Sequence, residues 1–109
     1  MAKNYKIIAQ ASPAATTNTT LYTVPSATQV TVSSVTICNR AATAATYRIA
    51  MRPDAETLAD KHYIAYDASV PANDTIALTL GLTADAADVI TVYSSTASVS
   101  FGVFGSEIA

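Results

Sequence analysis

Charge is scarce in this sequence of 109 residues. Asp, Glu, Lys and Arg make up 13% of it, about half of the roughly 25% that is usual in globular domains. The formal net charge is −2 and the chain has no basic cluster, which argues against binding nucleic acid through phosphate contacts. Half of the residues are nevertheless hydrophobic. Few charges together with high apolarity favour a protein whose surfaces are covered by other subunits.

Cysteine, histidine and tryptophan are almost absent. Cys38 is the only cysteine, so it forms no disulfide within the chain, and tryptophan, the usual platform of a carbohydrate-binding surface, does not occur. His62 is the only histidine. If residues 60–62 were extended, Asp60 and His62 would share a face. This leaves two interpretations open: an imidazole oriented by Asp60, or a hydrogen-bonded histidine with no chemical role.

Long hydrophobic runs are also missing. The uncharged run that ends at Arg40 is interrupted by Pro, Asn and many Thr, so it predicts no membrane helix. The first residues, MAKNYKII, carry two lysines without a sustained apolar core or a clear cleavage site. We therefore expect no secretion signal and synthesis in the cytoplasm.

The clearest positive pattern is a long Thr- and Val-rich segment at residues 24–40. Its valines alternate with polar residues, but the phase reverses between Val32 and Val35. One extra residue at Ser33–Ser34 would produce this reversal, because it swaps the side chains that face the core. The segment therefore predicts a long strand with a β-bulge.

Shorter segments show the same alternation and are separated by turn signals. The sequence thus predicts an all-β protein, a single antiparallel β-sandwich of jelly-roll or immunoglobulin-like type with seven or eight short strands. We expect residues 1–20 to form an N-terminal strand or arm followed by a flexible loop, and residues 21–109 to form the sandwich. The further strands are expected at residues 5–10, 21–24, 47–51, 62–66, 76–83, 89–93 and 99–103, the last closed by Gly102 and Gly105.

Groups for catalysis or metal binding do not converge in the sequence. No serine lies in a Gly-x-Ser-x-Gly elbow. Asp54, Glu56 and Asp60 form a loose acidic cluster without the glycine and the ligand spacing of a calcium loop. We expect no enzymatic activity, no metal site and no cofactor.

Arginine and tyrosine provide the candidate interface residues, which are Arg40, Arg48, Arg52, Tyr63 and Tyr66. Arg48 and Arg52 should occupy the face opposite the apolar residues of their own strand. Arginine is favoured at interfaces because its planar fork makes bidentate contacts, although a solvated polar face would show the same pattern. Alternation places Tyr63 and Tyr66 on opposite faces of their strand, so that one of them could meet a partner.

Several segments taken together resemble a family of small virion proteins from tailed bacteriophages, including phages of cyanobacteria. The similarity covers nearly the whole chain from Leu21 onward. It implies a β-structured component of the particle without catalysis, in heads, necks, tails or fibres. The matching segments are LYTVP at 21–25, VTICNR at 35–40, YRIAMRP at 47–53, DKHYIAYD at 60–67, ANDT at 72–75 and FGVFGSE at 101–107.

Our leading functional expectation is therefore a capsid decoration (cement) protein, made in the host cytoplasm and located in the virion. It would bind the outer surface of the head and stabilise the junctions between capsomers. We expect the major capsid protein or other virion proteins as partners, and a homo-oligomer, for which a trimer is one candidate arrangement. We expect no nucleic acid and no membrane as partners. The alternatives are a neck, tail, baseplate or fibre component, or a carbohydrate- or host-surface-binding module.

Overall fold

The computed structural model describes residues 3–109, which fold into nine strands and two short 3-10 turns. No helix in this part of the chain is long and apolar enough to cross a membrane. The elements are β1 (Lys3–Ala11), β2 (Thr19–Thr23), β3 (Gln29–Asn39), β4 (Ala45–Arg52), η1 (Pro53–Ala55), η2 (Asp60–His62), β5 (Tyr63–Val70), β6 (Thr75–Leu78), β7 (Leu82–Ala84), β8 (Val89–Ser94) and β9 (Val99–Ile108).

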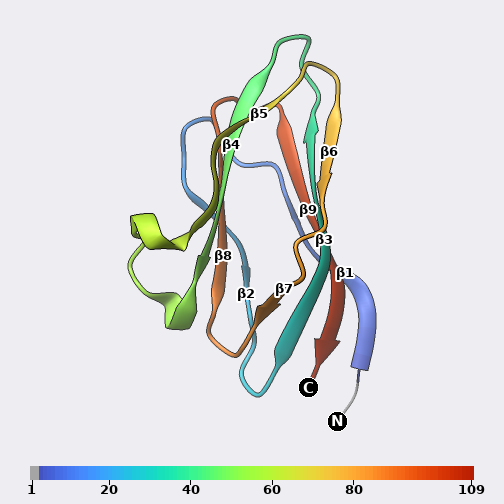
Figure 1. The fold of residues 1–109 in the computed structure, drawn as a ribbon, viewed down its shortest axis with the longest axis vertical. Helices are drawn as coiled ribbons and strands as arrows, with labels where there is room; N and C mark the ends of the chain where they lie inside the picture. Colours follow the sequence, from blue (N-terminus) through green and yellow to red (C-terminus); the bar gives the residue numbers. More distant parts are fainter. Residues whose placement is uncertain (1–2) are drawn as a thin grey trace.

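The strands form two antiparallel sheets that face each other (Figure 1). Sheet A has the order β1-β9-β3-β6, with β7 also paired to β3, and sheet B has the order β2-β8-β4-β5. The pairs are nested: β1 with β9, β2 with β8, β3 with β6 and β7, and β4 with β5. A long hairpin rolled into two sheets has this connectivity, so the expected β-sandwich is confirmed and its topology is that of a jelly roll.

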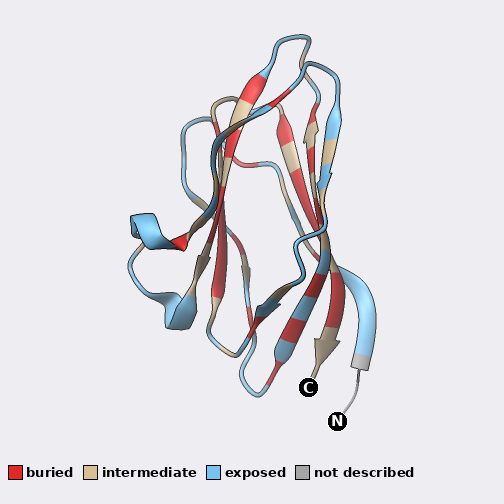
Figure 2. Cartoon of the chain, in the orientation of Figure 1, coloured by how far each residue is buried: buried red, intermediate tan, exposed pale blue. Residues whose placement is uncertain are grey.

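The predicted bulge in β3 is confirmed. Against β9, Val32 lies opposite Gly105 and Ser34 lies opposite Phe104, so Ser33 is the extra residue. Buried and exposed residues alternate along β3 with the phase change that the bulge requires (Figure 2). Both halves of this strand can therefore point their valines into the core.

The expectation that glycines close the last strand is wrong, because β9 continues through them to Ile108. A Cβ atom on Gly105 would lie 2.0 Å from the carbonyl oxygen of Thr31. Glycine at this position allows β3 to approach β9 closely beside the bulge.

The structure also has more strands than the seven or eight expected, because the predicted strand at residues 76–83 is divided into β6 and β7. β6 pairs with β3 on one side of the bulge and β7 pairs with β3 on the other. Between them Gly81 adopts φ +62°, a left-handed conformation that suits glycine. The bulge thus interrupts the hydrogen-bonded ladders along both edges of β3.

The core lies between the two sheets and consists mainly of valine, isoleucine and one phenylalanine. Burying each such side chain contributes roughly 1.5–3 kcal/mol relative to leaving it exposed. The expected N-terminal strand is β1, which is hydrogen-bonded to β9 and buries Ile8 in the core. The largest fully buried side chains are Phe101, Ile37, Ile49, Ile90, Val24, Val30, Val32, Val35, Val70, Val92, Val99 and Val103.

Candidate functional site

The outer surface of sheet B carries two of the candidate arginines. Tyr47 and Ile49 of β4 are buried in the core, so Arg48 and Arg52 point to the other side of the sheet, as predicted. Arg48 lies opposite Tyr93 of β8 in the β4–β8 ladder. Strand alternation alone therefore positions the arginines, whereas their partners come from neighbouring strands.

Arg48 is held by two aromatic rings and one carboxylate. Its guanidinium lies 4.2 Å from the ring centroid of Tyr66 and 4.1 Å from that of Tyr93, distances typical of cation–π contacts. Its Nε donates to Asp67 Oδ1 at 2.6 Å and its Nη2 donates to Asp67 Oδ2 at 3.3 Å. The hydrogen bond to Asp67 raises the pKa of Arg48 further above its ordinary value. Arg48 is thus a fixed support for Tyr66 rather than a mobile charge.

Tyr63 and Tyr66 do not lie on opposite faces, so that expectation is wrong. Their rings touch edge to face, with centroids 4.9 Å apart and an interplanar angle of 83°. The register between β4 and β5 shifts on both sides of Ile49, and Asp67 has φ 50°, so the simple two-residue period does not hold along β5. The two tyrosines and the arginine stack consequently meet on one side of sheet B.

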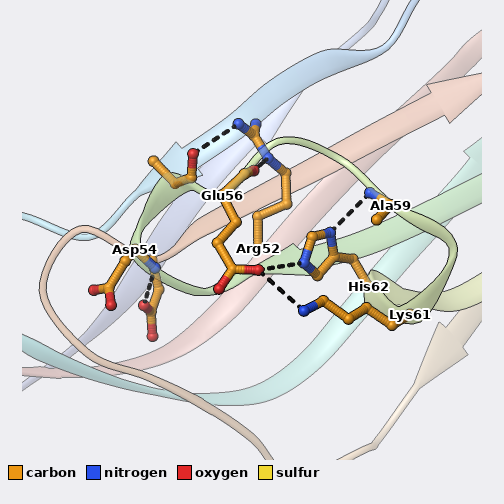
Figure 3. A network of polar contacts seen from close by, with 8 residues as sticks. Arg52, Asp54, Glu56, Ala59, Lys61 and His62 are labelled. Atoms are coloured by element: carbon orange, nitrogen blue, oxygen red, sulfur yellow. Dashed lines mark hydrogen bonds and ion pairs between the residues drawn. The ribbon is translucent and has the colours of Figure 1, made fainter.

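A loop between β4 and β5 continues this surface, and Arg52 fixes its first half (Figure 3). Arg52 Nε donates to the carbonyl oxygen of Glu56 at 2.7 Å, and Nη2 donates to that of Ala55 at 3.4 Å. Nη1 donates to Thr91 Oγ1 on β8 at 3.3 Å. The guanidinium therefore ties the loop backbone to the sheet.

His62 fixes the second half of the loop. Ala59 N–H donates to Nδ1 of the buried imidazole at 3.0 Å, so the ring proton lies on Nε2 and donates to Glu56 Oε1 at 3.2 Å (Figure 3). The His62 hydrogen bond, helped by Lys61 at 3.3 Å, lowers the pKa of Glu56. His62 is thus a hydrogen-bonded structural residue. Asp60 does not orient it, because residues 60–62 form a 3-10 turn instead of a strand.

A shallow hollow opens beside this loop. It has a volume of about 350 Å³ and is lined by Asp60, Tyr63 and Tyr66. Tyr66 is 56% exposed. Sequence reasoning found the two tyrosines but missed the support from Tyr93 and Asp67, since that support depends on strand order and on an irregular register.

Arg40 does not belong to this group. Its Nε donates to Ser100 Oγ at 3.0 Å, and its Nη2 donates to Ser12 Oγ at 2.9 Å and to the carbonyl oxygen of Ala97 at 3.1 Å. These contacts join the β1–β2 loop and the β8–β9 turn at one end of sheet A. The five candidate interface residues therefore occupy two separate places.

The outer surface of sheet A is different in kind. Residues directly opposite each other in a ladder share a face. Val35 and Val103 point inward, so their neighbours on β3 and β9 point outward. Among the described strands, no Asp, Glu, Lys or Arg takes an outward position between the Tyr5–Ser106 pair and the Cys38–Ser100 pair. We call this surface the neutral face; it includes Tyr5, Ile7, Thr36, Ala77, Phe104 and Ser106.

Residues 3–109 contain no group of three or more His, Cys, Asp or Glu side chains arranged to hold a metal ion. Comparison with known proteins finds no family model that matches the chain and no matching curated protein. The strand order by itself places the protein in the class of all-β jelly rolls, a fold that viral capsid domains, lectins and cupins share.

Proposed function

We propose that the chain is a structural protein of a tailed-phage particle, and specifically a decoration protein bound to the outside of the head. The observation that carries the proposal is the neutral face of sheet A. The similarity of the sequence to small virion proteins adds the kind of particle. The jelly-roll fold is compatible with this role but does not select it.

The neutral face has the properties of a covered surface. A surface meant to stay in water is best made with about 25–35% charged residues, whereas this face has none at its outward positions. Tyr5 is 77% exposed and Ile7 is 56% exposed on it. Covering such a face removes apolar area from water and strips no ion of its hydration, which makes docking favourable.

The partner in this proposal is the major capsid protein. A symmetric shell offers the same docking site many times, so a modest interface at each site is sufficient. Each bound copy would add buried area across a junction between capsomers. No catalytic step is required.

Counting copies on purified particles of the phage that encodes the chain tests the proposal. Quantitative mass spectrometry against the major capsid protein should give copies on the order of hundreds per DNA-filled head, as the symmetry of a shell requires. About six or twelve copies, the number expected for a ring at the neck or tail, would overturn the decoration role. Absence from washed particles would overturn the virion role altogether.

A further inference from the structure

The geometry points to a binding site for an organic cation in the hollow of Asp60, Tyr63 and Tyr66, and we propose that its ligand is the ammonium group of a lysine side chain on a partner protein. The site lies on sheet B, so it is separate from the neutral face. It does not depend on the proposed function.

The two tyrosines supply adjoining aromatic walls. Their rings are nearly perpendicular, at 83°, with centroids 4.9 Å apart, and both line the hollow. A cation within about 6 Å of a ring centroid is attracted by the negative face of the ring. Two walls at a right angle offer this attraction from two directions, which is the principle of an aromatic cage.

Asp60 supplies the negative charge. Its carboxylate forms no hydrogen bond or ion pair with any residue between 4 and 109, although it lines the hollow. The acidic residues near it are already paired: Glu56 with His62 and Lys61, and Asp67 with Arg48. The carboxylate that borders the hollow is therefore the one still available to a ligand.

The site is held in place before any ligand arrives. Arg48 packs against Tyr66 and is fixed by Asp67, which also neutralises its charge. On the other side, the bond between Glu56 and His62 fixes the turn that carries Asp60. Rings and carboxylate that are already positioned lose little conformational freedom on binding, so more of the interaction energy appears as affinity.

A lysine ammonium suits the hollow better than other ligands. It is a compact point charge with three donors, so it can contact a carboxylate and two ring faces at once. A volume of about 350 Å³ is at the small end of the range for ligand sites, which fits one side-chain terminus.

The test is an NMR titration of the ¹⁵N-labelled chain with Nα-acetyl-lysine methylamide. The norleucine analogue, which has the same stem without the charge, is the matched control ligand. The lysine probe should shift the amide signals of Asp60, Tyr63 and Tyr66, whereas the norleucine probe should not. Equal shifts with both probes would show that charge is not recognised and would overturn the proposal.

Two variants separate the site from general electrostatics. Asp60→Asn should weaken binding of the lysine probe by about tenfold, the size of one charge-assisted contact. Asp54→Asn removes the same charge from the same loop but lies outside the hollow, so it should leave the affinity unchanged. Equal losses in the two variants would overturn the proposal, as would binding of a methyl glycoside in place of the lysine probe.

Discussion

The two outer surfaces of the sandwich differ more than their shared strand pattern would suggest. On sheet B, Arg48 and Arg52 are surrounded by aromatic rings, carboxylates and a pinned loop. On sheet A, the outward positions carry hydroxyls, small residues and a few exposed apolar side chains. The low overall charge of the sequence is therefore not spread evenly.

This difference shows which surface loses less solvation free energy when a partner covers it. Docking on the neutral face desolvates no ion, whereas docking on sheet B must accommodate Arg48 and Asp67, which already satisfy each other. Sheet B is thus suited to recognising one specific group, and sheet A is suited to broad contact.

Charge placed on the two sides of β3 should have opposite kinds of consequence. Val35 is 1% exposed and points inward, so Val35→Asp should unfold the domain, because an unpaired buried charge costs several kcal/mol. Thr36 is the next residue and points outward, so Thr36→Asp should fold but lose its binding to particles. Circular dichroism melts check the first effect. A folded Val35→Asp variant would show that the strand phase is wrong.

The bulge in sheet A should depend on glycine at one position. Gly105→Ala should destabilise the domain by about 3 kcal/mol, because its Cβ would overlap the Thr31 carbonyl. Gly81→Ala is the matched control: nothing lies within 4 Å of its Cβ, so only the strain of φ +62° remains, about 1 kcal/mol. Urea unfolding measures both variants. Equal losses would contradict the close approach of β3 and β9.

A matched pair of isoleucines compares the two sheets directly. Ile7 on β1 and Ile64 on β5 are both exposed, at 56% and 40%. Ile7→Glu should weaken binding to undecorated heads by about 100-fold, because it buries a charge in the interface. Ile64→Glu should bind nearly as the unaltered chain does. Co-sedimentation with heads measures the two affinities. A loss of affinity in Ile64→Glu as large as that in Ile7→Glu would contradict docking through the neutral face of sheet A.

Acid should weaken one ion pair on each side of the sandwich. Glu107 bonds Lys6 and accepts a hydrogen bond from Tyr22, with Lys6 the larger cause of its lowered pKa, while Glu56 bonds His62 and Lys61. Because the pKa of each carboxyl is lowered by folding, its ionised form contributes to the free energy of unfolding. This contribution is present above about pH 4.5 and is lost as the pH falls through the pKa of the folded state.

Glu107→Gln should therefore show a smaller fall in Tm between pH 7 and pH 3 than the unaltered chain. The effect is small because Lys6 is largely exposed, with 45% of its side chain accessible. An unchanged pH profile would mean that the pair contributes nothing to stability.

The sequence predicted what depends on local alternation. The phase change between Val32 and Val35 located the β3 bulge, and the same logic placed Arg48 outside the core. It did not predict what depends on pairing between distant strands. Tyr93 becomes a partner of Arg48 only because β8 lies next to β4.

Local irregularities account for the remaining errors. The register of β5 against β4 shifts between Tyr63 and Ala65, so Tyr66 meets Tyr63 on one side of the sheet. The role of Gly105 depends on a bulge in another strand, so it looked like a strand end in the sequence. Neither feature leaves a signal within its own segment.

A density map of the particle at side-chain resolution tests the central claim most directly. Tyr5, Ile7 and Phe104 should be out of solvent, packed against the major capsid protein on the outside of the head. A map in which the neutral face is open to solvent while sheet B contacts the head would contradict the account.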